Sequence, residues 1–199
     1  KQSALLVRLA SGDEDQRADV VIELGSMLSA YPAEQSTVDA LSQSLRRDSS
    51  LLVRALAARA MELSRDERFV PTLLVSLKTE KDISIRKASI YALAYQRARD
   101  SLIDLLKKRG KDEDIFARSQ AARGLGKMAY PESIEALIIS LNRDKAQDVR
   151  RASAQALGLI AGNQEMKAVE ALELARLDAD PYLVSAVELA LNRINSRVP

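Results

Sequence analysis

Residues 147–157 read QDVRRASAQAL, and three earlier stretches repeat this pattern without a gap: LLVRALAARAM from Leu51, ISIRKASIYAL from Ile83 and IFARSQAARGL from Ile115. The arginines of these four stretches are spaced 32 residues apart, at Arg54, Arg86, Arg118 and Arg150. Weaker copies surround Arg17 (DQRADVVIELG) and begin at Tyr182 (YLVSAVELALN). Self-similarity at a fixed period predicts an array of stacked repeats.

Each period contains two helical patterns. In the second, apolar residues recur at −1, +3, +6, +7 and +10 from the arginine, which places them on one face of a helix. The first is Leu-rich, and no useful stretch alternates with period two, so we predict no strands. We therefore expect an all-α fold, an α-α superhelix of about six helix-turn-helix repeats in a single array over 1–199. The expected repeats are roughly 1–30, 31–64, 65–97, 98–129, 130–161 and 162–199.

Composition removes several function classes. The 199 residues include no Cys and no His, which excludes thiolate nucleophiles, imidazole bases and the usual zinc ligand sets. The net charge of +2 argues weakly against a dedicated nucleic-acid binder. No apolar run is long enough to span a membrane. Because the first residue is Lys rather than Met, we expect the chain to have been trimmed.

An acidic residue stands six positions before each repeat arginine, at Asp48, Glu80, Asp112 and Asp144, and Asp178 occupies this column in the last copy. We expect these turn carboxylates to pair with arginines of the same or the adjacent repeat, or to cap the second helix. The alternative is an anion or substrate site built on the arginines. Recurrence once per repeat favours a structural ladder, made of Asp48, Arg54, Glu80, Arg86, Asp112, Arg118, Asp144 and Arg150.

Glycines and acidic clusters have structural explanations as well. Gly124 and Gly126 fall inside a helical pattern with no preceding strand, so close helix packing explains them better than a phosphate loop. The clusters Asp13–Asp15 and Asp112–Asp114 precede helices, where negative charge complements the helix dipole. The Asp112–Asp114 cluster lacks the alternating ligands and the closing Glu of a calcium loop. We therefore predict no catalytic residue, no metal site and no cofactor.

The VRxxAxxALG-like core, the Leu-rich preceding helix and the turn aspartate together resemble HEAT-type repeats. The short period is similar to the HEAT-like subgroup first noted in phycobilisome lyase subunits, and VRRASAQALGLI from Val149 matches best. The resemblance covers about Asp13 to Ile194. It implies an interaction scaffold in most cases, whereas a few members are lyases, hydroxylases or DNA glycosylases.

In HEAT-like arrays the second helices line the concave side, and their solvent stripe is expected at +1, +5 and +9. This stripe carries Arg, Lys and Tyr but no acid in the central copies, and it also includes Ser119. The first helices carry glutamates instead, among them Glu132, Glu135, Glu165, Glu170 and Glu173. The predicted binding residues are Arg59, Lys87, Tyr91, Tyr95, Arg123, Lys127, Arg151 and Gln155.

Tyr and Arg supply much contact energy at interfaces, so this basic groove suits an acidic peptide or protein segment. The leading function is a non-catalytic scaffold with a protein partner. An ordinary solvated helix face is the structural alternative, in which the two tyrosines cover a seam between repeats. Binding of a polyanion or nucleic acid, and a bilin lyase-like role suggested by the resemblance, are the functional alternatives. The oligomeric state is not readable from the sequence.

Overall fold

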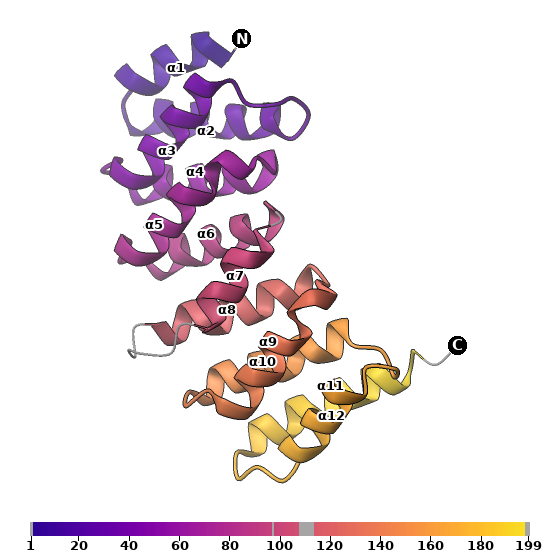
Figure 1. The fold of residues 1–199 in the computed structure, drawn as a ribbon. Helices are drawn as coiled ribbons and strands as arrows, with labels where there is room; N and C mark the ends of the chain where they lie inside the picture. Colours follow the sequence, from indigo (N-terminus) through magenta and orange to yellow (C-terminus); the bar gives the residue numbers. More distant parts are fainter. Residues whose placement is uncertain (1, 97, 108–113, 198–199) are drawn as a thin grey trace. The chain divides into compact units, whose positions relative to one another are not determined.

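The structure is a computed structural model that describes residues 2–96, 98–107 and 114–197. These residues form twelve α-helices, two short 3-10 helices and no β-strand, which confirms the all-α prediction. The chain divides into two compact units, Lys1–Ala98 and Arg99–Pro199. Both units consist of helix pairs, each made of a first helix followed by a second helix (Figure 1).

The first unit contains three pairs: α1 (Gln2–Ser11) with α2 (Glu14–Leu28), α3 (Gln35–Arg47) with α4 (Leu51–Ser64), and α5 (Val70–Thr79) with α6 (Ile83–Tyr95). A 3-10 helix, η1 (Glu67–Phe69), precedes α5. The first helices α1, α3 and α5 contact one another in series, and the second helices α2, α4 and α6 do the same. Each first helix also packs on its own second helix, so the unit has two layers.

The second unit repeats this plan with α7 (Arg99–Lys107) and α8 (Asp114–Lys127), α9 (Ile134–Arg143) and α10 (Gln147–Ile160), and α11 (Met166–Ala175) and α12 (Pro181–Asn195). The 3-10 helix η2 (Pro131–Ser133) precedes α9. Helices α8, α10 and α12 form the second-helix layer, and α7, α9 and α11 form the first-helix layer. The six pairs fall within the six expected repeats. The repeat boundaries themselves, and their joining into one array, stay predictions.

The periodic apolar residues of the second helices form the core of each unit. In α4, Val53, Ala57 and Met61 are completely buried, and they are the −1, +3 and +7 positions around Arg54. Full burial of a side chain such as Val or Met stabilises a fold by roughly 1.5–3 kcal/mol. The helix pair is therefore stable only when neighbouring pairs cover this face.

Glycines allow the second helices of the second unit to approach closely. A Cβ atom at Gly158 of α10 would lie 2.5 Å from the Cα of Ala190 in α12. A Cβ atom at Gly126 of α8 would lie 2.7 Å from the Cα of Ala156 in α10. Backbone atoms cannot yield as a flexible side chain does, so these positions accept no larger residue without moving a helix. The structure thus shows helix packing, and not a phosphate loop, at Gly126.

Helix starts explain the acidic clusters. The Asp13 carboxylate accepts a hydrogen bond from the backbone N–H of Gln16 at 2.9 Å, and the Gln16 side chain accepts one from the Asp13 N–H at 3.3 Å. This reciprocal capping box begins α2. Asp82 caps α6 by accepting from the N–H groups of Ser84 and Ile85. Asp112 and Glu113, predicted to do the same, lie outside the described residues.

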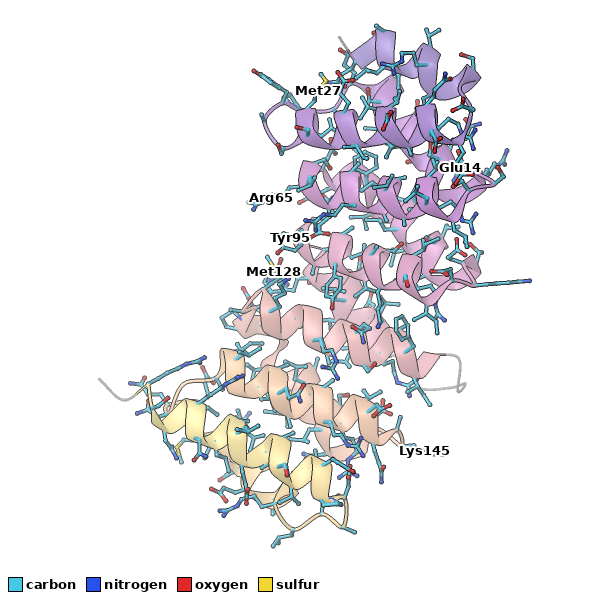
Figure 2. All side chains as sticks on the ribbon, turned by 180° about the vertical axis from the view of Figure 1, so that it is seen from behind. Glu14, Met27, Arg65, Tyr95, Met128 and Lys145 are labelled. Atoms are coloured by element: carbon cyan, nitrogen blue, oxygen red, sulfur yellow. The ribbon has the colours of Figure 1, made fainter. Side chains whose placement is uncertain are left out.

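Each unit has two edges. The turn edge is the side on which first helices join second helices, and the loop edge is the side on which one pair joins the next. Figure 2 shows both edges of the first unit, with Glu14 on the turn edge and Met27, Arg65 and Tyr95 on the loop edge. In the second unit Lys145 lies on the turn edge and Met128 on the loop edge (Figure 2).

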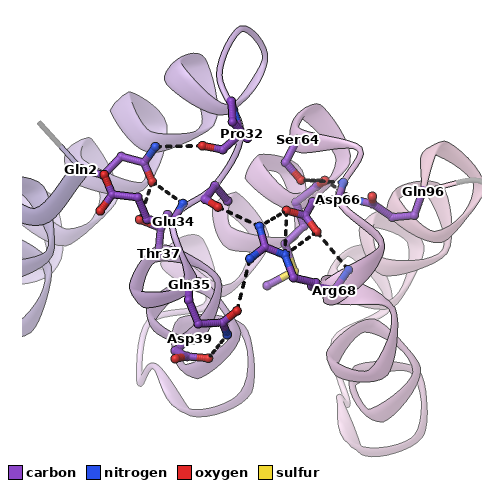
Figure 3. Close-up of polar contacts among 12 residues, drawn as sticks. Gln2, Pro32, Glu34, Gln35, Thr37, Asp39, Ser64, Asp66, Arg68 and Gln96 are labelled. Carbon is purple, nitrogen blue, oxygen red and sulfur yellow. Dashed lines mark hydrogen bonds and ion pairs between the residues drawn. The ribbon is translucent and has the colours of Figure 1, made fainter.

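Polar contacts hold the loop edge of the first unit together (Figure 3). The Gln2 side chain donates to the carbonyl oxygen of Pro32 at 3.1 Å and accepts from the N–H of Glu34 at 2.9 Å. Arg68 donates to the carbonyl oxygen of Ala33 at 2.7 Å and to the Gln35 side chain at 3.2 Å. These bonds connect α1 with the start of α3, and the start of α3 with η1, directly before α5. Successive pairs are therefore fixed in register at this edge.

Candidate functional site

Arg54 shows how the repeat arginine works. Its Nη1 donates to the backbone carbonyl of Asp48 at 2.8 Å, within its own turn. Its Nε donates to Oε2 of Glu80 at 2.8 Å, in the turn of the following repeat. Glu80 also accepts from the backbone N–H groups of Lys81 and Asp82, at 2.8 and 3.0 Å. One guanidinium therefore connects two successive turns, and one carboxylate closes the second turn.

The same contact recurs along both units. The Nε of Arg17 lies 2.9 Å from Oδ2 of Asp48, and the Nε of Arg118 lies 2.8 Å from Oδ2 of Asp144. Arg150 forms an ion pair with Asp178. In each case the acid belongs to the repeat that follows the arginine. Asp112, the turn acid after Arg86, lies outside the described residues.

These ion pairs keep the turn carboxylates charged. Burial alone would raise the pKa of Glu80, but hydrogen bonds from Arg54 and from two backbone N–H groups together lower it below the usual value. The hydrogen bond from Arg150, with help from the N–H of Asp180, lowers the pKa of Asp178. In the four described pairs, the arginines and acids of the two columns contact one another as the structural alternative expects.

The second-helix face of the first unit carries four predicted binding residues. Lys87 and Tyr91 of α6 are exposed, and Tyr95 is half-buried near the end of the same helix. Arg59 of α4 is exposed, and its Nη1 lies 2.7 Å from Oε2 of Glu62. Glu62 therefore lies beside the basic stripe. It was not expected there, because it is not at a +1, +5 or +9 position.

Arg59 and Tyr95 line a common hollow of about 450 Å³ at the loop edge of the first unit. Arg65, directly after α4, lines the same hollow, as do Leu63 and Glu62. Ser29 and Ser64 complete it. Arg65 and Tyr95 lie near one another on this edge in Figure 2. The hollow combines two guanidinium groups, one phenol, one carboxylate and an apolar side chain.

The second unit carries the remaining predicted residues. Arg123 and Lys127 of α8 are exposed, and Nη1 of Arg123 donates to the Gln155 side chain of α10 at 3.3 Å. Ser119, expected on the solvent stripe, is buried instead and donates to the carbonyl oxygen of Phe116 at 3.0 Å. The predicted stripe of α8 therefore presents two cations to solvent, Arg123 and Lys127, near the end of the helix.

Arg151 is already engaged inside the second unit. Its Nε lies 2.8 Å from Oδ2 of Asp180, and its guanidinium carbon lies 5.0 Å from the ring centre of Tyr182. It also contacts Asp148, one turn earlier, at 3.2 Å. These contacts connect α10 with the start of α12, as the repeat arginines do elsewhere. A partner that binds Arg151 has to compete with them.

Arg65 was missed by the sequence analysis, although it contributes a cation to the hollow. It stands eleven residues after Arg54, beyond the last position of the stripe, in a left-handed conformation with φ of 51°. Ala129 stands eleven residues after Arg118 with φ of 50°. This conformation marks the ends of α4 and α8. A search of the column that follows each second helix would have found Arg65.

The described part of the chain has neither a cluster of metal ligands nor a membrane-spanning helix. No group of three or more Asp and Glu side chains there is placed to hold a metal ion. No helix in the same part is long and apolar enough to cross a membrane.

Three overlapping matches to a family model described as HEAT repeats cover residues 3–94, 70–158 and 99–192. The chain belongs to the HEAT-repeat family. The helix pairs and their two layers agree with this assignment. A search of curated protein sequences gives no match.

Solved structures show the same fold as this HEAT-repeat chain. One is the CpcE–CpcF complex of phycocyanin lyase from Nostoc sp. PCC7120, with 22% identity over 98% of this chain and 77% of that chain and a TM-score of 0.56. Another comes from a study of microtubule plus-end tracking by XMAP215, CLIP-170 and EB1, with 19% identity, 98% and 91% coverage and a TM-score of 0.62. A third, of Kap95p binding to RanGDP, has 16% identity, 96% and 29% coverage and a TM-score of 0.58. At these identities the likeness is one of fold.

Proposed function

We propose that this HEAT-repeat chain is a non-catalytic protein-interaction scaffold whose second-helix faces bind an acidic peptide or protein segment. The family supports the general role, since the HEAT fold serves mostly as a scaffold. Two structural relatives come from protein complexes, CpcE with CpcF and Kap95p with RanGDP. The acidic character of the partner rests on the residues of this chain.

The hollow of Arg59, Arg65 and Tyr95 is the observation that carries the proposal. Arginine and tyrosine are enriched among the residues that dominate binding energy, because they combine a large contact area with hydrogen-bonding groups. The single carboxylate of the hollow, Glu62, is already paired with Arg59. The hollow therefore favours a partner that brings carboxylates, which charged guanidinium groups bind in a bidentate manner.

Exposed side chains extend this surface beyond the hollow in the first unit. Tyr91 lies one turn and Lys87 two turns before Tyr95 on α6, on the same side of that helix. An extended segment that fills the hollow can follow α6 along these residues. In the second unit the cations of Arg123 and Lys127 offer a separate basic surface of the same kind.

Affinity capture with matched variants tests the proposal. The double variant Tyr91→Ala/Arg123→Ala removes one side chain from each second-helix face, and Arg65→Ala/Tyr95→Ala empties the hollow. Tyr31→Ala/Lys167→Ala is the control, because it also removes an exposed tyrosine and an exposed cation but from outside these faces. A partner captured from native extract and released by moderate salt should be lost with the first two variants and kept with the control.

Melting curves of Tyr91→Ala/Arg123→Ala and of the control should match that of the unchanged chain, because the replaced side chains are exposed. Arg65→Ala/Tyr95→Ala should melt at a lower temperature but remain folded at the temperature of the capture, because Tyr95 is half-buried. Equal capture by all variants would show that the second-helix faces are not the binding surface. Displacement of the partner by random duplex DNA, with a steep dependence on salt, would indicate a polyanion site instead.

A further inference from the structure

The two helix layers of the first unit end differently. The last turns of the first helices carry cations: Arg8 in α1, Arg46 and Arg47 in α3, and Lys78 in α5. The last turns of the second helices α2, α4 and α6 carry none. A helix dipole favours a cation at the C-terminal end of any helix, so it does not explain a difference between the layers. The first helices therefore place a row of positive charge along the turn edge.

Two acids beside this row, Asp48 and Glu80, are paired with ladder arginines. Asp48 accepts two hydrogen bonds from Arg17 and one from the N–H of Ser50, each at 2.9 Å. Glu80 is held by Arg54 and by two backbone N–H groups. Arg47, by contrast, is exposed and forms no ion pair within the described part of the chain. The ladder thus offsets the charges of Asp48 and Glu80, whereas Arg46 and Arg47 stay exposed beside them.

A hollow of about 590 Å³ lies in this basic row, between the ends of α3 and α5. Arg46, Arg47 and Lys81 line it, together with Leu45, Leu51, the paired ladder residues and one further carboxylate, Asp82, which caps α6. The side chain of Leu51 is 54% exposed, although it begins a helix whose other face is fully packed. Arg47 also lines two neighbouring hollows of about 520 and 420 Å³. Cations therefore surround an accessible leucine at the turn edge.

We propose that this turn-edge surface, made of Arg46, Arg47, Leu51, Lys78 and Lys81, is a second docking site, and that it takes an acidic peptide segment bearing an apolar side chain. The cations bind the carboxylates, and Leu51 offers apolar area that a single partner side chain can cover. A nucleic acid fits less well, because phosphates gain nothing from a leucine. None of the described residues that line the three hollows is aromatic, so bases find no stacking surface there.

This site is separate from the hollow of the proposed function. The turn-edge surface lies at the C-terminal ends of first helices, whereas Arg59, Arg65 and Tyr95 lie at the C-terminal ends of second helices. The two groups occupy opposite edges of the first unit (Figure 2). Both sites can therefore be filled at once, and the chain would then hold two partners together.

A photo-crosslinking probe tests this site independently of the second-helix face. The probe is a fluorescein-labelled nonapeptide with four Asp or Glu residues on each side of a central photoreactive leucine. We expect crosslinks within residues 45–51 and 76–82 of the full chain, located by mass spectrometry. Arg46→Glu/Arg47→Glu should abolish them. Arg65→Glu/Lys87→Glu, a matched charge reversal on the other surface, should leave them in place.

Binding strength tests the role of the leucine. Binding of the labelled nonapeptide is measured by fluorescence anisotropy at about 0.1 M salt. The part of the binding signal that Arg46→Glu/Arg47→Glu removes is assigned to the turn-edge surface. Leu51→Ser in the chain, or Leu→Ser in the nonapeptide, should weaken this part of the binding by about tenfold, as expected from loss of one apolar contact. Single-site variants Arg47→Gln and Lys81→Gln repeat the test with less change in charge, should the double reversal disturb folding.

The turn-edge proposal is wrong if crosslinks are absent from the two segments, or if Arg46→Glu/Arg47→Glu leaves them unchanged. It is also wrong if inorganic polyphosphate binds more tightly than the peptide and Leu51→Ser has no effect on either ligand. The last result would assign the surface to polyanions. Loss of crosslinks only with Arg65→Glu/Lys87→Glu would leave the proposed function standing and remove the second site.

Discussion

Asp144 accepts two hydrogen bonds from the guanidinium of Arg118, from Nε at 2.8 Å and from Nη2 at 3.1 Å. The two side chains are only 2% and 6% exposed. The same carboxylate accepts from the backbone N–H of Ala146 at 2.9 Å, which closes the turn before α10. A charged pair thus lies inside the second unit, where each charge depends on the other for compensation.

Asp144→Ala should destabilise the fold strongly. The substitution removes the carboxylate that balances a buried guanidinium, and breaking a buried pair from one side costs about 3–5 kcal/mol. Urea unfolding followed by circular dichroism measures the free energy of unfolding. Joint replacement of Arg118 and Asp144 by Met and Leu should cost much less than Asp144→Ala, because no buried charge remains.

Glu173→Ala is the control for this comparison. Glu173 pairs with Arg176 at 3.0 Å, one turn away on the surface, and both side chains are about half exposed. Exposed pairs contribute about 0–1 kcal/mol. Equal losses for Asp144→Ala and Glu173→Ala would show that burial does not set the strength of the Arg118–Asp144 contact.

Acid should unfold the second unit through its turn carboxylates. Hydrogen bonds from Arg150 and Arg151 lower the pKa values of Asp178 and Asp180 respectively in the folded state. A carboxyl whose folded pKa is lowered contributes stability above the unfolded pKa, about 4, and loses it as the pH falls through the folded pKa. The urea midpoint should therefore be flat near pH 7 and fall below about pH 4.

Asp178→Asn/Asp180→Asn should reduce this acid sensitivity. An asparagine keeps an acceptor for the backbone N–H groups of the turn but has no charge to lose. The double variant should be less stable than the unchanged chain at neutral pH, and the difference should shrink at pH 3. A constant difference at both pH values would mean that other carboxylates govern the acid transition.

The sequence predicted that the repeat arginines contact turn carboxylates, but it did not predict which carboxylate each arginine contacts. The acid six residues before Arg54 is Asp48, whereas the structure pairs the Arg54 side chain with Glu80 and uses only the backbone carbonyl of Asp48. Both acids stand in the same column of the repeat. Which one an arginine reaches depends on how closely successive turns stack, and a linear pattern carries no such distance.

The solvent stripe was predicted less well, for a related reason. A helical period gives the direction of a side chain from its own helix, but not the segment that covers it. Ser119 occupies a predicted position of the stripe, directly after Arg118, and is nevertheless buried. Arg151 also lies on the stripe, and Asp180 from the next turn engages it. Other positions of the stripe, such as Lys87 and Arg123, stay exposed as predicted.

Ala129→Gly should stabilise the chain. Ala129 has φ of 50°, a left-handed conformation in which an L side chain costs about 1 kcal/mol and glycine costs little. We expect a gain of about 0.5–1 kcal/mol, seen as a higher melting temperature. Ala30→Gly serves as the control, because Ala30 is also exposed at the end of a second helix but has no positive φ. That variant should lose stability, since glycine gains freedom in the unfolded chain.

Gly158→Ala should lower the stability of the second unit, and it tests whether the layer of second helices is held by backbone proximity. The new Cβ would lie 2.5 Å from the Cα and 2.6 Å from the Cβ of Ala190, so α10 and α12 must move apart. Overpacking of this kind costs typically about 1–3 kcal/mol. Gly162→Ala, two residues beyond the end of α10, is the matched control, because its Cβ would meet no atom within 4 Å and its φ is not positive. Urea unfolding should separate the two variants by at least 1 kcal/mol or so, and a neutral Gly158→Ala would mean that α10 and α12 have room to yield.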